Sequence, residues 1–153
     1  MGAVLAERTS KSGGSLRLQL LNGVAHDQIP DFLAALDALV LPSRTTPYWS
    51  EQFGRVLVEA MAAGTPVVGS DSGAIPEVIG DAGLVFAEGD ASSLAQAIAR
   101  IAQDAPLRDR LVLAGRARAR AEFDWGAFAS RSVAFFRSLR GETTDAGAFE
   151  EIE

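Results

Sequence analysis

The chain of 153 residues contains no cysteine, one lysine and one histidine. The lack of cysteine excludes disulfides, zinc–thiolate sites, iron–sulfur clusters and thiol nucleophiles, and it favours a reducing, cytoplasmic setting. Lys11 falls in a polar N-terminal stretch, so the expected core has no lysine for a P-loop or a Schiff base. A Ser-His-Asp triad would have to use His26, and no nucleophile-elbow motif accompanies it.

The chain also lacks long hydrophobic runs and an excess of basic residues. No run of 18 apolar residues is present, so we expect no transmembrane helix. The first residues, MGAVLAERTSKSGG, lack the basic start and apolar stretch of a signal peptide. The net charge of −6 would repel nucleic acid. What remains is the composition of an ordinary globular protein, with a length that suits one domain.

Short apolar runs of β type alternate with helical patterns between two polar ends. Residues 1–15 predict a flexible lead, residues 16–140 one folded domain, and residues 141–153 a disordered acidic tail. The patterns predict strands over 16–24, 38–41, 65–69 and 83–86, and helices over 27–36, 53–63, 74–79, 91–103, 106–121 and 125–139. This alternation predicts an α/β fold, in which a parallel, Rossmann-like sheet of four strands is flanked by helices.

The strand, loop and helix over residues 38–63 carry the most informative side chains. Ligands of such sheets bind beyond the carboxyl ends of the strands, where Glu51 and Gly54 end a polar loop. Gly54 lets a ligand approach the backbone, and the start of the following helix favours a diphosphate. Glu59, about one and a half turns into that helix, can accept hydrogen bonds from ribose hydroxyls, and Glu51 can do the same for a sugar ring. A phosphate between two hydroxyl-bearing rings describes a nucleotide sugar.

The same side chains also allow a purely structural interpretation. Arg55 and Glu59 are spaced i,i+4 and would form a surface ion pair that contributes a few tenths of a kcal/mol. Glu51 would simply be favoured by the positive end of the helix dipole. The residues alone leave both interpretations open.

The stretch SEQFGRVLVEAMAAGTPVVGSDSGAIPEVIGDAGLVF resembles the E-x7-E region of the GT4 family of retaining glycosyltransferases. ALVLPS before it and the last helix after Phe123 agree, so the resemblance covers about residues 20–139. It implies the C-terminal, donor-binding half of a two-domain GT-B fold. It also implies transfer of a sugar from a nucleotide-diphosphate sugar to an acceptor with retention at the anomeric carbon, with no metal ion and no cofactor besides the donor substrate.

The resemblance assigns roles to individual residues. Glu51 corresponds to the catalytic-site glutamate that contacts the donor-sugar hydroxyls, as a positioning group rather than a covalent nucleophile. The backbone of Phe53 and Gly54 corresponds to the segment that lines the sugar and the diphosphate. Glu59 corresponds to the ribose ligand.

A second set of assignments concerns the start of the resemblance. Gly23 and Val24 correspond to a segment that borders the base, whereas His26 falls in a variable surface turn and is expected to be structural. Family members also have an N-terminal acceptor-binding domain and, at the start of the donor-binding domain, a strand, a glycine-rich loop and an Arg/Lys pair on the diphosphate. Lys11 and Arg17 do not match that pair, so the resemblance implies that residues 16–140 are a partial donor-binding domain. We therefore expect the isolated chain to be inactive, with weak or no donor affinity, and to need the N-terminal domain or a partner chain.

Other functions stay open. One is a non-catalytic or split-subunit module that binds nucleotide sugars and needs a partner chain; a flavodoxin-like signalling domain is disfavoured, because its acidic cluster and lysine are absent. The aromatic residues of the last helix are expected to be core or interdomain contacts: Trp125, Phe128, Phe135 and Phe136. An exposed face there would favour self-association or peripheral membrane contact. The sugar, the base and the acceptor are not specified by the sequence.

Overall fold

The computed structural model describes residues 19–140; the predicted lead over 1–15 and tail over 141–153 lie outside this range. Three short strands alternate with helices, as the sequence patterns predict. In chain order the elements are η1 (His26–Gln28), α2 (Ile29–Ala34), β1 (Leu39–Leu41), α3 (Arg55–Ala63), β2 (Val67–Ser70), α4 (Ile75–Ile79), β3 (Leu84–Phe86), α5 (Ala91–Gln103), α6 (Ala105–Phe123) and α7 (Trp125–Leu139).

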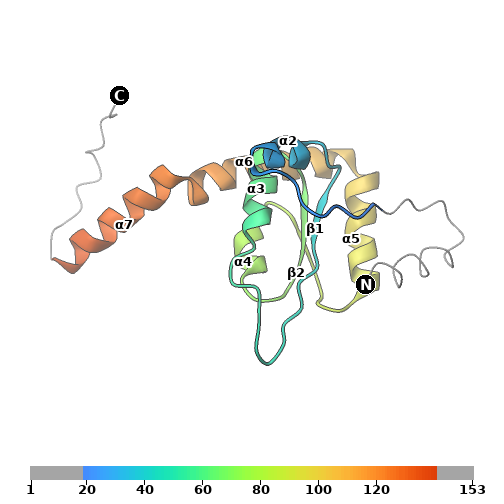
Figure 1. The fold of residues 1–153 in the computed structure, drawn as a ribbon, viewed down its shortest axis with the longest axis horizontal. Coiled ribbons are helices and arrows are strands. Elements are labelled where there is room, and N and C mark those ends of the chain that lie inside the picture. The colour runs from blue at the N-terminus through green and yellow to red at the C-terminus, as the bar shows by residue number, and fades with distance from the viewer. Residues whose placement is uncertain (1–18, 141–153) are drawn as a thin grey trace, which may run out of the picture.

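The strands form a parallel sheet in the order β1-β2-β3, with helices on both faces. Figure 1 shows α3 and α4 on one side of the strands and α5 on the other. Consecutive residues of a strand point to opposite faces. Val67 accordingly belongs to the core cluster under α3 and α4, whereas Val68 belongs to the cluster under α5. Both side chains are buried, and the Rossmann-like α/β architecture is confirmed.

Helix α3 is delimited by glycine at both ends. Gly54 and Gly64 have φ values of +78° and +89°, the left-handed conformation that favours glycine. The amide of Gly64 donates to the carbonyls of Ala60 and Met61, which closes the last turn. Leu57 and Met61 are fully buried beneath the helix, and each contributes about 1.5–3 kcal/mol through burial. The helix that carries Glu59 is therefore fixed to the core along one side.

The strand predicted over residues 16–24 is wrong in its described part, because residues 19–24 form no strand. Leu20 and Leu21 are 61% and 52% exposed. An alternating pattern makes a strand only where a neighbouring strand takes up its backbone hydrogen bonds, and no described strand pairs with this segment. The described sheet therefore has three strands instead of the predicted four.

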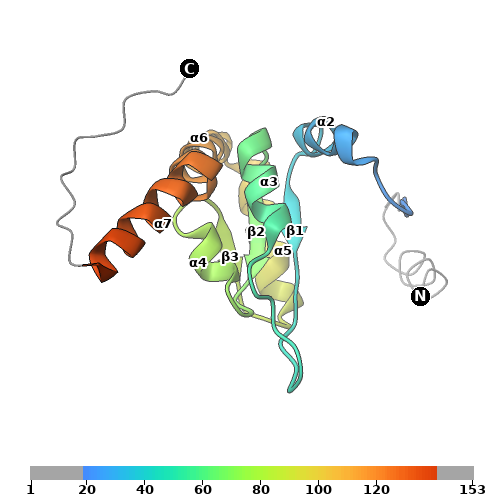
Figure 2. The ribbon, with the colours of Figure 1, turned by 60° about the vertical axis from the view of Figure 1, so that its left-hand side comes forward.

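Helix α7 has no buried side chain. Figures 1 and 2 show it running away from the sheet beyond α6. Of the two roles predicted for its aromatic residues, packing in the core is wrong and an interdomain contact stays a prediction, since all four are more than half exposed: Trp125, Phe128, Phe135 and Phe136. The prediction of an exposed apolar face on this helix is confirmed.

Across residues 19–140, no helix combines the length and the apolar character that crossing a membrane would require.

Candidate functional site

Hydrogen bonds tie together the loops that follow the three strands, at the lower edge of the sheet in Figure 1. The buried hydroxyl of Ser70 donates to the carbonyl of Ser43 at 2.7 Å, which joins the loops after β1 and β2. The hydroxyls of Thr45 and Ser72 share a second bond of 2.8 Å. The amide of Thr45 donates to Glu88, beyond β3, at 2.9 Å. The carboxyl edge of the sheet is thus a connected polar surface.

Glu51 is held by both its side chain and its backbone. Ser43 Oγ donates to Oε2 at 3.2 Å and the Gly54 amide donates to Oε1 at 3.0 Å. The backbone carbonyl of Glu51 accepts from the amide of Ala74 at 2.9 Å. A Cβ on Gly73, which has a φ of +56°, would lie 2.0 Å from that carbonyl oxygen. Only glycine at position 73 permits this approach, so the position of Glu51 depends on the next loop along the sheet.

The start of α3 offers backbone donors next to Glu51. No side chain caps the helix, although Gly54 is its N-cap residue. Uncapped N–H groups in the first turn, together with the helix dipole, favour an anion. Gly54 is buried against the side chains of Leu41 and Leu57, which an added Cβ would approach to 3.1 Å and 3.0 Å. The ring of Phe53 meets the ring of Phe123 edge-on, with 5.5 Å between the ring centroids, and Phe53 lines a cavity together with Arg55 of the first turn.

Glu59 makes the ion pair that the structural interpretation predicts. Its Oε1 lies 3.2 Å from Nε of Arg55, and the two side chains are 34% and 83% exposed. Such an exposed pair stabilises the helix by only about 0.3–0.5 kcal/mol. The contact engages one carboxylate oxygen, which leaves the other able to accept a hydrogen bond from a ligand.

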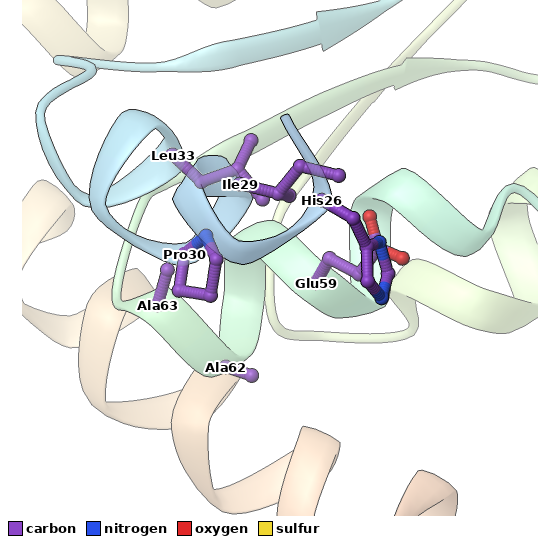
Figure 3. Close-up of a pocket in the computed structure, with 7 residues that line it drawn as sticks. All are labelled: His26, Ile29, Pro30, Leu33, Glu59, Ala62 and Ala63. Atoms are coloured by element: carbon purple, nitrogen blue, oxygen red, sulfur yellow. The ribbon is translucent and has the colours of Figure 1, made fainter. Parts of the chain in front are cut away.

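Glu59 also lines a cavity of about 370 Å³ between α3 and the segment formed by η1 and α2 (Figure 3). Small-molecule sites commonly measure about 300–1,000 Å³. The lining residues are His26, Ile29, Pro30, Leu33, Glu59, Ala62 and Ala63. In Figure 3 the two polar side chains, His26 and Glu59, lie at one end of the cavity, and the apolar residues form the rest of its wall.

Glu59 and Arg55 line a second cavity on the other side of α3, of about 610 Å³. Its remaining walls come largely from the end of α6 and the start of α7, and they include the rings of Phe123, Trp125 and Phe128. The two cavities place Glu59 between a space next to α2 and a space next to α7.

The structure brings the predicted site residues together only in part. Glu51 and Gly54 are in direct contact, but Glu51 lines neither of these two cavities. Glu59 lies five residues beyond Gly54, about 7 Å further along the helix axis. Gly23 is exposed and Val24 half-buried, and the lining of the smaller cavity begins just after them, at His26. Glu59 therefore lies on α3 and Glu51 in the loop before it, and only Glu59 lines these two cavities.

His26 is the cavity residue that sequence reasoning missed. The resemblance places it in a variable surface turn with an expected structural role; the structure shows that it is exposed, as such a turn would be, and that it lines the cavity beside Glu59. The apolar residue Ile29, three positions later, could have indicated this location. Ile29 begins α2 and packs against the core cluster that contains buried residues of α3. A turn that leads directly into this contact has to lie close to α3.

Comparisons with known proteins agree on one family. A family profile described as "Glycosyl transferases group 1" matches residues 3–118. A phosphatidyl-myo-inositol mannosyltransferase from Mycobacterium leprae is 43% identical over 91 residues, which cover 58% of this chain and 24% of that protein. The structure of Anabaena Alr3699/HepE in complex with UDP is similar with a TM-score of 0.76 and 28% identity, over 90% of this chain and 37% of that one.

A further solved structure concerns the fold alone. It is the C-terminal domain of a group 1 family glycosyl transferase (LpcC) from Francisella tularensis, with a TM-score of 0.69 at 24% identity, over 81% of this chain and 63% of that one. The chain spans about a quarter to a third of the length of the curated relatives that it matches. Because the family profile covers more than half of the chain, the protein belongs to the group 1 glycosyl transferases. Its described residues have the Rossmann-like fold of part of the C-terminal half of a GT-B fold.

Proposed function

We propose that this domain binds the nucleotide-diphosphate sugar donor of a retaining glycosyltransferase, and that the donor lies along one face of α3. The observation that carries the proposal is the order of side chains on that face. Arg55, Glu59, Ala62 and Ala63 are spaced by three or four residues and so share one face of the helix. From the start of the helix onward, this face presents backbone donors and a cation, then a carboxylate, then small apolar groups.

The spacing of these groups suits an extended nucleotide. At about 1.5 Å of rise per residue, Glu59 lies about 7 Å and Ala62 about 12 Å beyond Gly54 along the helix axis. A diphosphate at the helix start, a ribose at Glu59 and a base beside Ala62 and Ala63 follow one another in the same order. The UDP bound in the Anabaena relative supports a nucleotide as the ligand class.

At the sugar end, Glu51 acts as a positioning group. Its carboxylate is fixed by Ser43 and the Gly54 amide, and it faces the helix start where the diphosphate would lie. In the proposed reaction the bond between the anomeric carbon and the diphosphate oxygen breaks, and the acceptor attacks from the same face. The helix amides stabilise the charge that develops on the leaving diphosphate, so the proposal includes no metal ion.

The test measures how much the affinity for a ribose-containing nucleotide depends on the carboxylate of Glu59. The proposal requires the 153-residue chain to bind the nucleotide at least weakly, and saturation-transfer NMR detects weak binding. The experiment would compare UDP with 2′-deoxy-UDP, for the unchanged chain and for Glu59→Gln. Loss of a charge-assisted hydrogen bond costs about 1.5–3 kcal/mol, so we expect the substitution to weaken UDP binding about tenfold or more. The same substitution should change 2′-deoxy-UDP binding much less. Glu77→Gln, on the exposed side of α4, is the matched control. Equal losses for both nucleotides would contradict the assignment.

A second candidate function is a donor-binding module that works with a separate chain. It is favoured by one observation: α7 buries no side chain and presents exposed aromatic residues. The 153-residue chain alone is expected to show negligible transfer from UDP-, GDP- or ADP-sugars. Turnover that appears when a separately produced N-terminal, acceptor-binding domain is added would favour the module; robust turnover by the chain alone would refute the dependence on a second domain.

A further inference from the structure

We propose that Ser70, a buried residue at the end of β2, is a positioning residue for the Glu51 carboxylate and acts on it through Ser43. The hydroxyl of Ser70 fixes the backbone of Ser43, and the hydroxyl of Ser43 fixes the carboxylate. The functional half of this inference rests on the proposed function, because it takes Glu51 as the group that contacts the donor sugar.

Ser70 brings a hydroxyl into an otherwise apolar strand. It ends β2, whose other residues are Val67, Val68 and Gly69, and only 1% of its surface is exposed. A buried hydroxyl costs free energy unless it is hydrogen-bonded, and this one donates to the carbonyl of Ser43 at 2.7 Å. The side chain of Ser70 is therefore directed toward the loop that follows β1.

The carbonyl of Ser43 meets this donor just beyond the end of the ladder between β1 and β2. The last paired residues of that ladder are Leu41 and Gly69, and Pro42 has no amide with which to continue it. The Ser70 hydroxyl takes the place of a backbone donor and holds the Ser43 peptide against β2. Ser43 thus has a fixed position although it lies outside the strands.

From this position Ser43 determines where the carboxylate of Glu51 lies. Its hydroxyl donates to Oε2 at 3.2 Å, and the Gly54 amide donates to Oε1 at 3.0 Å. The loop after β2 also holds the backbone of Glu51, since the amide of Ala74 donates to its carbonyl at 2.9 Å. The end of β2 and the loop after it therefore hold Glu51 twice: at the carboxylate through Ser70 and Ser43, and at the backbone through Ala74.

A neighbouring pair of hydroxyls joins the same two loops and provides the matched control. Thr45 and Ser72 share a hydrogen bond of 2.8 Å, which leads to Thr45 instead of Ser43. Thr45→Ala removes a bond between the loops, whereas Ser70→Ala removes a bond that also leads to the carboxylate. If the loops needed only to be held together, both substitutions would affect Glu51 equally.

The Gly54 amide reports the position of the carboxylate in the 153-residue chain without any ligand. Its proton resonance and its hydrogen-exchange rate, measured by NMR, depend on the bond to Oε1 of Glu51, and Glu51→Ala gives the values for complete loss. We expect Ser43→Ala and Ser70→Ala to move both values toward that limit. Ser70→Thr, which keeps the hydroxyl, should restore the values, and Thr45→Ala should leave them unchanged.

A double variant shows whether Ser70 acts through Ser43. With Ser43→Ala already in place, adding Ser70→Ala should produce little further change, because the hydroxyl on which Ser70 acts is gone. Additive changes, or an effect of Thr45→Ala as large as that of Ser70→Ala, would overturn the inference. Ser70→Cys has a side chain of similar size but is a weak donor, so it supplies the same measurement if Ser70→Ala does not fold.

Ligand affinities test the functional half. The affinity for UDP-glucose relative to UDP, and for GDP-mannose relative to GDP, isolates the contribution of the sugar. Where the sugar nucleotide binds more tightly, we expect Ser43→Ala to reduce this advantage about fivefold, the effect of one hydrogen bond, and Ser70→Ala to reduce it by a smaller factor. The affinity for the diphosphate alone should not change, whereas a merely structural role would weaken both ligands alike.

The outcomes separate this inference from the proposed function. If the Gly54 amide does not respond to Ser70→Ala in a folded variant, the positioning role of Ser70 is overturned and the donor site is unaffected. An advantage of the sugar nucleotide that Ser43→Ala and Ser70→Ala leave unchanged would overturn the functional half. If the amide responds but neither sugar nucleotide binds more tightly than its diphosphate, the sugar contact of Glu51 in the proposed function is overturned, while the link from Ser70 to the carboxylate stands.

Discussion

Replacing Gly73 by alanine should loosen the loop that positions Glu51. Gly73 has a φ of +56°, and a side chain in this conformation costs about 1–2 kcal/mol. The added Cβ would lie 2.0 Å from the carbonyl oxygen of Glu51, so the two loops have to separate. That separation removes the 2.9 Å hydrogen bond from the Ala74 amide to the same oxygen, which contributes about 1 kcal/mol. We expect the free energy of unfolding to fall by about 2–3 kcal/mol.

Gly89→Ala is the matched control for this measurement. Gly89 also has a positive φ, +76°, but the nearest atom to an added Cβ is the end of the flexible Arg44 side chain at 3.4 Å. This variant carries the conformational cost without the collision, so it should lose only about 1–2 kcal/mol. Urea denaturation of the 153-residue chain measures both. Equal losses in the two variants would refute the idea that Gly73 is required by its contact with Glu51.

Three more outcomes follow from the described contacts. Arg118→Ala removes two hydrogen bonds to backbone carbonyls at the end of α4, so the free energy of unfolding measured by urea denaturation should fall by about 1–3 kcal/mol. A fall below about 0.5 kcal/mol, the effect of an ordinary surface substitution, would contradict this. Replacing both Phe135 and Phe136 by serine should reduce self-association and the binding of a dye that reports exposed apolar surface. An unchanged chain that is already monomeric by light scattering and binds no dye would contradict the prediction of an apolar contact surface on α7. Glu51→Ala should leave UDP affinity unchanged but remove any gain in affinity of UDP-sugars over UDP; an unchanged gain would argue against its contact with the sugar.

The elements of the fold that sequence predicts well are those with local signals. Gly64 ends α3 in the left-handed conformation that its position after a helical run predicts. The apolar run that forms β2 is buried at every residue, as expected of a central parallel strand. The order of strands and helices follows from these signals, because each element is specified by its own residues.

What sequence failed to predict depends on contacts between distant segments. The alternation over residues 19–24 has no described partner strand, so it does not form a strand. The aromatic positions of α7 have helical spacing, but spacing does not supply a surface to cover them. His26 reaches the cavity because α2 packs on α3, a contact that no local pattern encodes.

In the candidate site, too, the sequence identifies the residues, whereas contacts in the fold decide how their side chains are oriented. Family resemblance and helix position identify Glu51, Gly54 and Glu59; the structure adds that the carboxylate of Glu51 accepts a hydrogen bond from the amide of Gly54 at the start of α3. The direction of each carboxylate is decided by neighbours: Ser43 and Gly54 for Glu51, and Arg55 for Glu59. Their roles toward a sugar and a ribose stay predictions.

The most direct measurement of the central claim is an intermolecular nuclear Overhauser experiment between a bound nucleoside diphosphate and methyl groups of α3. If the nucleotide lies along the face that carries Arg55 and Glu59, its base and ribose protons will show contacts to the methyl groups of Ala62 and Ala63. Contacts to Trp125 and Phe128 with none to these alanines would contradict the account.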